Sequence, residues 1–167
     1  VPPGADGLVV LPYMSGERTP INDPKARGVF FGLNLHHTRA HIYRACLEGV
    51  GYGIAQHFDI LKERGVSTRR VAAVGGGTLN PRWLQIVSDI TGREQFVPRE
   101  AIGACYGDAM LAALAVGHLP SLDAVQELVG EGRVITPDPA AHAAYQPLRR
   151  IYDELYQSTR SLMHSLP

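Results

Sequence analysis

The sequence predicts an α/β fold in which a mixed sheet is packed with helices. Short apolar runs rich in β-branched residues predict strands, and longer segments with apolar residues every three to four positions predict helices. The two kinds of segment alternate along most of the chain, which is typical of sheets covered by helices. A length of 167 residues suits one domain, and no internal repeat is visible.

Two strands joined by a loop are expected first. Apolar runs closed by glycine predict strands at 7–14 and 28–33. The intervening segment 15–27 carries two prolines, Gly16 and an Asn-Asp pair, so its turn chemistry predicts a loop. A loop of this length permits the two strands to pair antiparallel.

A long helix is expected to follow, from Thr38 to Arg64. Its apolar residues recur at helical spacing, Thr38 is an N-cap candidate and Gly65 is a C-terminal stop signal. Glycine in a helix interior costs about 1 kcal/mol relative to alanine. We therefore expect another element to pack closely against the helix backbone at its three internal glycines, Gly49, Gly51 and Gly53.

The next unit is a strand, a glycine turn and a helix. A strand at 70–74 runs into Gly75–Gly77, and Asn80 followed by proline opens a helix over 82–91. A strand at 94–98 would lie parallel to the strand at 70–74. Further helices are expected over 106–116, 122–129 and 140–166, the last with an apolar stripe of Tyr145, Leu148, Ile151, Tyr152, Leu155, Tyr156, Thr159 and Leu162.

The composition argues against several classes of protein. Lys and Arg number 16 and Asp and Glu number 16, so the chain lacks the basic balance of nucleic-acid or acidic-membrane binders. No apolar run approaches the roughly 18 residues that a membrane-spanning helix needs. Two cysteines are too few for a disulfide framework. We therefore expect reduced thiols and a cytoplasmic protein, with neither nucleic acid nor membrane as a partner.

The triple-glycine turn is the most informative local feature. Glycines let a ligand approach the backbone, and a helix N-terminus presents unpaired N–H groups that favour phosphate. The turn is not a dinucleotide fingerprint, because Asn80 stands at the last glycine position, and it is not a Walker loop, because no Gly-Lys-Ser/Thr follows. A tight turn without a ligand stays open as the alternative interpretation.

A second candidate, His37 and His41, has the four-residue spacing at which helix histidines can bind zinc. No glutamate stands at the metalloprotease position, and no third ligand accompanies the pair. We therefore expect surface histidines and no metal site.

Five ordered motifs resemble the C-terminal half of the FGGY carbohydrate kinases, among which xylulokinases are the nearest members. They span roughly residues 7–117 and are Gly16–Pro20, Arg27–Leu33, His41–Gly49, Gly75–Asp89 and Gly103–Ala109. Cys46 departs from the family pattern, which usually has an aliphatic or small residue there. Tyr106 and Asp108 replace a more frequent Ala-rich sequence.

The resemblance implies a ribonuclease-H-like lobe of the actin/hexokinase type and phosphoryl transfer from MgATP to a sugar hydroxyl, with xylulose as the first candidate. By position, Gly76 and Asn80 match family residues that contact the nucleotide, and Gly77 is adjacent. These three residues are therefore expected to bind the adenosine part of ATP. For Asn80 a second interpretation stays open, because capping its own helix would use the same polar group.

The resemblance also implies that the chain is the C-terminal portion of a longer kinase. The family's catalytic Asp and main phosphate-binding loops lie upstream of the matching segment, and no Asp of this chain falls in a motif that matches that of the catalytic Asp. Residues 1–167 are thus expected to form a C-terminal nucleotide-binding lobe that lacks the N-terminal lobe, a catalytic residue and most Mg²⁺ ligands. Such a lobe would be inactive alone, and its uncovered apolar surface would favour a homodimer.

Two other functions stay open. One is a non-catalytic interaction or assembly module that keeps the fold. The other is a kinase for another sugar or polyol, such as glycerol, gluconate or ribulose, because the absent lobe would make most of the sugar contacts.

Overall fold

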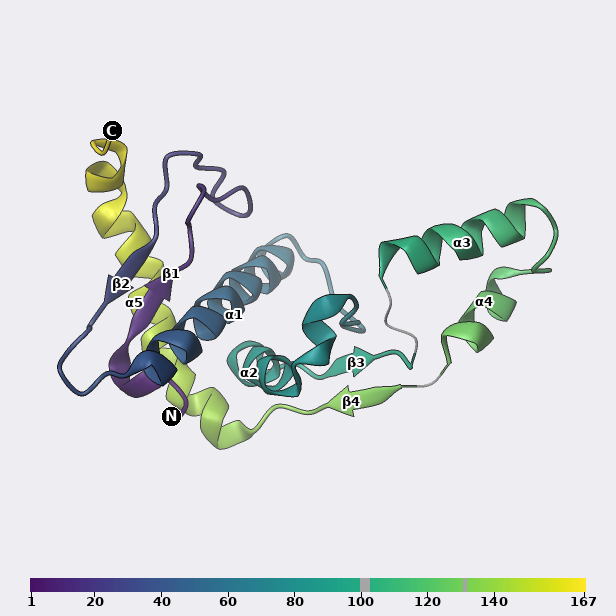
Figure 1. Cartoon of the computed structure of the whole chain (residues 1–167), viewed down its shortest axis with the longest axis horizontal. Helices are drawn as coiled ribbons and strands as arrows, with labels where there is room; N and C mark the ends of the chain where they lie inside the picture. The colour runs from purple at the N-terminus through teal and green to yellow at the C-terminus, as the bar shows by residue number, and fades with distance from the viewer. Residues whose placement is uncertain (100–102, 131) are drawn as a thin grey trace.

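The structure, a computed structural model, describes residues 1–99, 103–130 and 132–167. Figure 1 shows a packed body of β1, β2, α1, α2 and α5, from which β3 and β4 lead to an arm that carries α3 and α4. In chain order the elements are η1 (Ala5–Gly7), β1 (Val9–Leu11), β2 (Val29–Phe31), α1 (Arg39–Glu63), η2 (Gly76–Leu79), α2 (Pro81–Thr91), β3 (Gln95–Val97), α3 (Ala104–Ala115), α4 (Leu122–Val129), β4 (Arg133–Ile135) and α5 (Pro139–His164), where η marks a 3₁₀ helix.

The first two strands form the predicted antiparallel pair, with Val9 opposite Phe31. Both are shorter than predicted. Pro12 follows β1 and has no N–H for a ladder, and Gly32, with a φ of +86°, turns the chain at the end of β2. All three residues of β1 are buried, whereas β2 is more exposed.

The second sheet is mixed in direction. β3 pairs antiparallel with β4, and on its other side Phe96 forms a parallel bridge with Ala72. The amide of Ala73 donates to the Phe96 carbonyl at 2.9 Å, and the amide of Phe96 donates to the Val71 carbonyl at 2.8 Å. The predicted strand at 70–74 is thus reduced to one bridge with the predicted parallel direction. β4 is a strand that the sequence analysis missed.

Helix α1 begins and ends where the sequence predicts. The Thr38 amide donates to Nδ1 of His41 at 3.1 Å, which closes a capping box at the N-terminus. Nε2 of His41 lies 2.9 Å from a carboxylate oxygen of Asp6. At the other end Gly65 adopts a φ of +73°, a left-handed conformation typical of a helix stop.

The glycines of α1 lie where other elements press on the helix. A Cβ on Gly49 would run into the Val10 carbonyl of β1, and one on Gly51 would lie 2.7 Å from the Ile90 side chain of α2. A Cβ on Gly53 would lie 3.5 Å from the Tyr152 hydroxyl, an ordinary contact. The predicted close packing is therefore confirmed at the first two glycines.

Gly49→Ala is expected to destabilise the chain by about 1–3 kcal/mol, because the new methyl group must push α1 away from β1. Gly53→Ala is expected to stabilise it by about 0.5–1 kcal/mol, because the helix gains propensity without a clash. Urea unfolding of both variants measures the difference. Equal stability of the two would contradict the close packing of α1 on β1.

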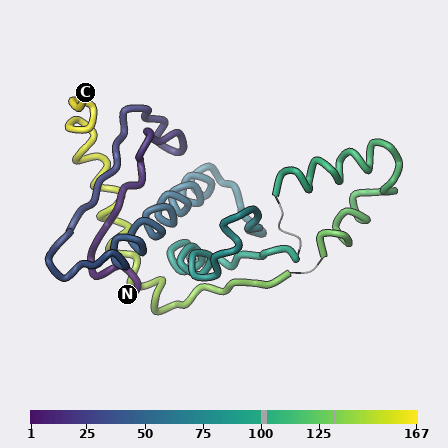
Figure 2. The backbone as a smooth tube through the Cα atoms, viewed as in Figure 1, coloured from purple at the N-terminus to yellow at the C-terminus, as the bar shows by residue number. Residues whose placement is uncertain are grey.

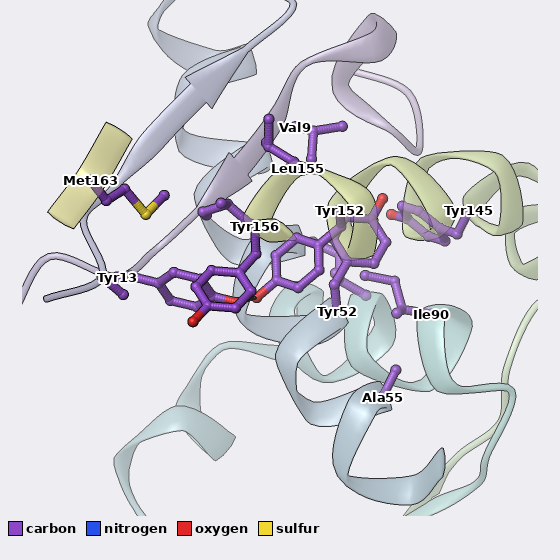
Figure 3. Packing of buried hydrophobic residues seen from close by; sticks show 13 residues of the cluster. Val9, Tyr13, Tyr52, Ala55, Ile90, Tyr145, Tyr152, Leu155, Tyr156 and Met163 are labelled. Atoms are coloured by element: carbon purple, nitrogen blue, oxygen red, sulfur yellow. Dashed lines mark hydrogen bonds between the residues drawn. The ribbon is translucent and has the colours of Figure 1, made fainter. Parts of the chain in front are cut away.

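The core is rich in tyrosine, as Figure 3 shows. The hydroxyl of Tyr13, after β1, donates to the hydroxyl of Tyr152 in α5 at 3.1 Å, and the rings of Tyr52 and Tyr152 have centroids 5.3 Å apart.

The predicted stripe of α5 needs two corrections. Ile151 and Leu162 are exposed, and Met163 is buried instead of Leu162, because the contact face follows a spacing of three to four residues from Tyr152.

The loop between β1 and β2 is tied to the end of α5 through Asp23, whose side chain is buried. Its carboxylate accepts hydrogen bonds from the Tyr156 hydroxyl at 2.8 Å and from Nε2 of His164 at 2.7 Å. The hydrogen bond from His164 is the main reason that the pKa of Asp23 is lowered to about 2. The carboxylate therefore stays ionised in neutral solution and holds the loop on the helix.

The arm projects from the body in both ribbon and tube views (Figures 1 and 2). α4 begins where the sequence predicts, with the Ser121 hydroxyl accepting a hydrogen bond from the Ala124 amide at 3.3 Å. Neither α3 nor α4 contains a buried residue. Within the described residues, no helix is both long enough and apolar enough to cross a bilayer.

Candidate functional site

The triple-glycine turn leads into η2 and then into α2. Gly75 has a φ of +86° and a ψ of −172°, which a residue with a side chain rarely adopts, so the backbone itself requires a glycine there. The hydroxyl of Thr78 donates to the Gly75 carbonyl at 2.7 Å and closes the turn.

The other two glycines of the turn differ in what surrounds them. A Cβ on Gly77 would lie 2.6 Å from the indole of Trp83, so packing explains the glycine. Gly76 is exposed, its φ is not in the left-handed range, and a Cβ on it would meet no atom within 4 Å. Neither conformation nor packing within the described residues explains the glycine at 76. A ligand or partner that approaches the backbone would explain it.

Asn80 caps α2, which is one of the two roles predicted for it. Its Oδ1 accepts a hydrogen bond from the Trp83 amide at 3.1 Å, and Pro81 takes the first helical position. The cap uses the carbonyl oxygen of the side chain. The amide nitrogen of the same side chain has no hydrogen-bond partner among the described residues, so the cap leaves one polar atom of Asn80 available.

Arg133 supports the turn from β4. Its guanidinium donates to the Thr78 carbonyl at 3.1 Å, which connects the second sheet to η2. Arg133 was not predicted as a residue of this site, because the strand β4 was not predicted. The signal was a three-residue run, Arg133–Ile135, too short to stand out from the loop around it.

The structure brings a second motif to the turn. A Cβ on Gly103, which precedes α3 with a φ of +94°, would lie 3.8 Å from the Cα of Gly75. The N-terminus of α3 therefore lies beside the triple-glycine turn, although Gly75 and Gly103 are 28 positions apart in the sequence. Helix N-termini carry a partial positive charge and unpaired amides, which suit an anionic ligand.

An apolar cavity of about 380 Å³ borders the turn. It lies between the Val71–Val74 segment, α1 and α2, and Gly77, Thr78 and Trp83 contribute to its wall. Its size falls within the range of small-molecule pockets. The Trp83 indole nitrogen is buried and has no hydrogen-bond partner among the described residues.

The other candidates serve local structure. His41 contacts Thr38 and Asp6. The centroid of its ring lies 5.4 Å from the centroid of the His37 ring. In the Gly16–Pro20 motif, the Glu17 carboxylate accepts a hydrogen bond from the Thr19 amide at 3.1 Å. Both cysteines are free thiols. In the part of the chain that the structure describes, no three His, Cys, Asp or Glu side chains form a group that could hold a metal ion.

The chain is similar to proteins of known family. The profile of the FGGY family of carbohydrate kinases, C-terminal domain, matches residues 1–116. The xylulose kinase of Escherichia coli K12 is 38% identical over 160 residues, which are 95% of this chain and 33% of that protein. The gluconokinase of Bacillus subtilis 168 is also 38% identical, over 156 residues, which are 93% of this chain and 30% of that protein.

A solved structure agrees with the sequence relatives. The crystal structure of xylulose kinase from Rhodospirillum rubrum matches with a TM-score of 0.83 and 39% identity, over 98% of this chain and 33% of that one. The fold is thus the ribonuclease-H-like C-terminal lobe of actin/hexokinase type that the family resemblance implies. The chain spans about a third of the length of the relatives it matches.

Proposed function

Because the chain belongs to the FGGY family of carbohydrate kinases, we propose that residues 1–167 form the C-terminal nucleotide-binding lobe of an ATP-dependent sugar kinase. The observation that carries the proposal is Gly76, an exposed glycine that neither backbone conformation nor packing requires. A nucleotide that lies against the backbone at this turn accounts for it.

The residues of the turn fit an adenine nucleotide. Gly76 leaves the backbone accessible, Gly77 shapes the turn, and the side-chain amide of Asn80 retains donors beside the cap. The N-terminus of α3 lies next to Gly75 and adds a favourable potential for an anionic ligand. In this proposal Gly76, Gly77 and Asn80 hold the adenosine part of ATP.

The rest of the machinery is assigned to the other lobe. Phosphoryl transfer requires a group that accepts the hydroxyl proton and Mg²⁺ to neutralise the phosphates. We place that base, most Mg²⁺ ligands and most sugar contacts in the remaining two thirds of the enzyme. Closure of the two lobes would exclude water from the transferring group. The 167-residue chain alone is therefore expected to bind nucleotide without phosphorylating a sugar.

The proposed sugar is xylulose, since xylulose kinases stand among the relatives in both sequence and structure. A gluconokinase with the same 38% identity favours gluconate as the second candidate. The proposed location is the cytoplasm, where sugar kinases find ATP.

Gly76→Ala is expected to leave folding unchanged and to weaken ATP and ADP binding at least about tenfold, because the new methyl group occupies the approach of the ligand. Trp83 is the only tryptophan and packs against Gly77, so its fluorescence reports on this turn. A fluorescence titration with ADP, excited at the red edge of the indole band, measures both affinities.

Gly53→Ala serves as the matched control, because it adds the same methyl group in α1, away from the turn. It is expected to bind ADP like the unmodified chain. Unchanged ADP affinity in Gly76→Ala, with both variants folded, would refute the assignment of the turn. A fluorescence that does not respond to ADP at millimolar concentration in the unmodified chain would refute the nucleotide-binding function.

A further inference from the structure

We propose that α1 holds one internal water molecule, which bridges the Oε2 atom of Glu48 and the hydroxyl of Tyr52 and completes the junction of η1, α1 and α5. The site takes a neutral ligand that donates one hydrogen bond and accepts another. The inference is independent of the proposed function, because neither residue belongs to the triple-glycine turn.

Two polar atoms in the interior of the body lack hydrogen-bond partners. Glu48 and Tyr52 each have only 1% of their surface exposed. The Oε2 atom of Glu48 and the hydroxyl oxygen of Tyr52 are both buried, and no described residue forms a hydrogen bond with either. Buried polar groups in folded proteins are almost always paired with protein atoms or with ordered water. The two atoms therefore require a partner that the described side chains do not supply.

The two atoms belong to one small region of the core. Glu48 and Tyr52 are four positions apart in α1, so they share a face of the helix. Both side chains also reach Tyr145 of α5. The Tyr145 hydroxyl donates to Oε1 of Glu48 at 2.8 Å, and the ring centroids of Tyr52 and Tyr145 are 6.1 Å apart. In Figure 3 the hydroxyl ends of these two tyrosines lie next to each other. One bridging molecule can therefore reach both orphaned atoms.

The hydrogen bonds to Glu48 show which kind of ligand is missing. Oε1 accepts from the Arg44 guanidinium at 2.6 Å, from the Tyr145 hydroxyl and from the Gly4 amide at 3.0 Å. Oε2 accepts from no described residue, although both oxygens of a carboxylate are acceptors. Arg44 already supplies the counterion, so the missing donor is a neutral one. Water meets this requirement, because it donates to Oε2 and accepts from the Tyr52 hydroxyl.

A direct hydrogen bond from Tyr52 to Glu48 is the competing arrangement. The Tyr52 ring is held between Tyr145 and Tyr152, with its centroid 5.3 Å from that of Tyr152. The hydroxyl oxygen lies in the plane of the ring, so it cannot approach Oε2 unless the ring or α1 moves within a packed core. A bridging water satisfies both atoms and leaves the packing unchanged.

The network also lies close to solvent on the Arg44 side. The Arg44 guanidinium donates to the Val1 carbonyl at 2.7 Å, and its side chain is partly exposed. A cavity of about 140 Å³ is lined by Val1, Arg44 and Leu47, among others. Water therefore stands beside the network and can fill the internal site.

The first test detects the bound water by NMR. Cross-relaxation between water and the protons of the 167-residue chain is measured, and cross-peaks are expected at the Tyr52 ring protons beside the hydroxyl. Tyr152 is the control for signals relayed through hydroxyl exchange, because its hydroxyl is buried but paired with Tyr13. Absent cross-peaks at Tyr52, or cross-peaks equal to those at Tyr152, would overturn the proposal.

The second test is the stability of Tyr52→Phe in urea. The equilibrium constant for folding is expected to fall at least about fivefold, because the water loses one of its two partners and Oε2 is no longer well satisfied. Tyr43→Phe is the matched control on the same helix, because Tyr43 is 59% exposed, and it is expected to change the constant by less than about twofold. An unchanged or increased constant in Tyr52→Phe would show a hydroxyl without a partner and overturn the proposal. A decreased constant in a chain whose Tyr52 gives no water cross-peak would overturn it in favour of the direct hydrogen bond.

The ionisation of Glu48 gives a third readout. The carboxyl ¹³C chemical shift of Glu48 in neutral solution is expected to be that of an ionised group, because the bridging water donates to Oε2. A protonated Glu48 would carry the missing proton on Oε2 itself, and this result would overturn the proposal.

Discussion

Replacing Glu48 by alanine is expected to destabilise the folded chain by about 3–5 kcal/mol. Glu48 lies in α1 with 1% of its surface exposed. One carboxylate oxygen accepts hydrogen bonds from the Arg44 guanidinium at 2.6 Å, the Tyr145 hydroxyl at 2.8 Å and the Gly4 amide at 3.0 Å. Alanine removes the acceptor for all three donors and leaves the Arg44 charge half-buried without its counterion.

The same network joins three parts of the fold. Gly4 precedes η1, Arg44 and Glu48 belong to α1, and Tyr145 belongs to α5. Burial raises the pKa of Glu48, while its three donors act in the opposite direction, so ionisation of Glu48 depends on keeping them in place.

Chemical denaturation measures the loss in Glu48→Ala. Glu154→Ala on the exposed face of α5 is the control, and it is expected to change the free energy of unfolding by no more than about 0.5 kcal/mol. If Glu48→Ala behaved like this control, the carboxylate would not organise the junction of η1, α1 and α5.

Replacing Tyr152 by alanine is the second large effect, with an expected loss of about 3–5 kcal/mol. The centroid of the Tyr152 ring lies 6.3 Å from that of Tyr13, in an edge-on contact, and 5.3 Å from that of Tyr52. The Tyr152 hydroxyl accepts a hydrogen bond from the Tyr13 hydroxyl. Alanine leaves a cavity where β1, α1 and α5 meet, and it leaves the Tyr13 hydroxyl without its acceptor.

One further variant separates the contribution of the Tyr152 ring from that of its hydroxyl, and a second serves as a control. Tyr152→Phe keeps the ring and loses only the hydroxyl, so a loss of about 1 kcal/mol is expected. Leu162→Ala, on an exposed position of the same helix, is expected to stay within about 0.5 kcal/mol. Thermal unfolding of the three variants gives the order, and a Tyr152→Ala variant as stable as Leu162→Ala would contradict the tyrosine core of Figure 3.

Helices with clear terminal signals were predictable from the sequence. Thr38 and Gly65 bound α1, and Asn80-Pro81 opens α2, because these residues fix the backbone locally whatever surrounds them. Strands were less predictable. The segment 70–74 has the composition of a strand, yet it pairs with β3 at only one position, because a strand requires a neighbouring strand and not only a suitable sequence.

The candidate site was predictable in part. The turn at Gly75–Gly77 and the cap at Asn80 follow from residue type. The roles of the three glycines do not, because a sequence cannot distinguish a glycine required by its φ, as at 75, from one required by a neighbour, as at 77. Arg133 and Gly103 reach the turn through tertiary structure, so no local pattern could place them there.

The central claim is that an adenine nucleotide lies against the triple-glycine turn. It is tested most directly by a titration of the isotope-labelled 167-residue chain with ADP, followed by amide NMR. The account predicts saturable chemical-shift changes at Gly76, Gly77 and Asn80, with the amides around Leu162 of α5 unaffected. Spectra that stay unchanged at these three residues up to millimolar ADP, in a chain that is folded, would contradict it.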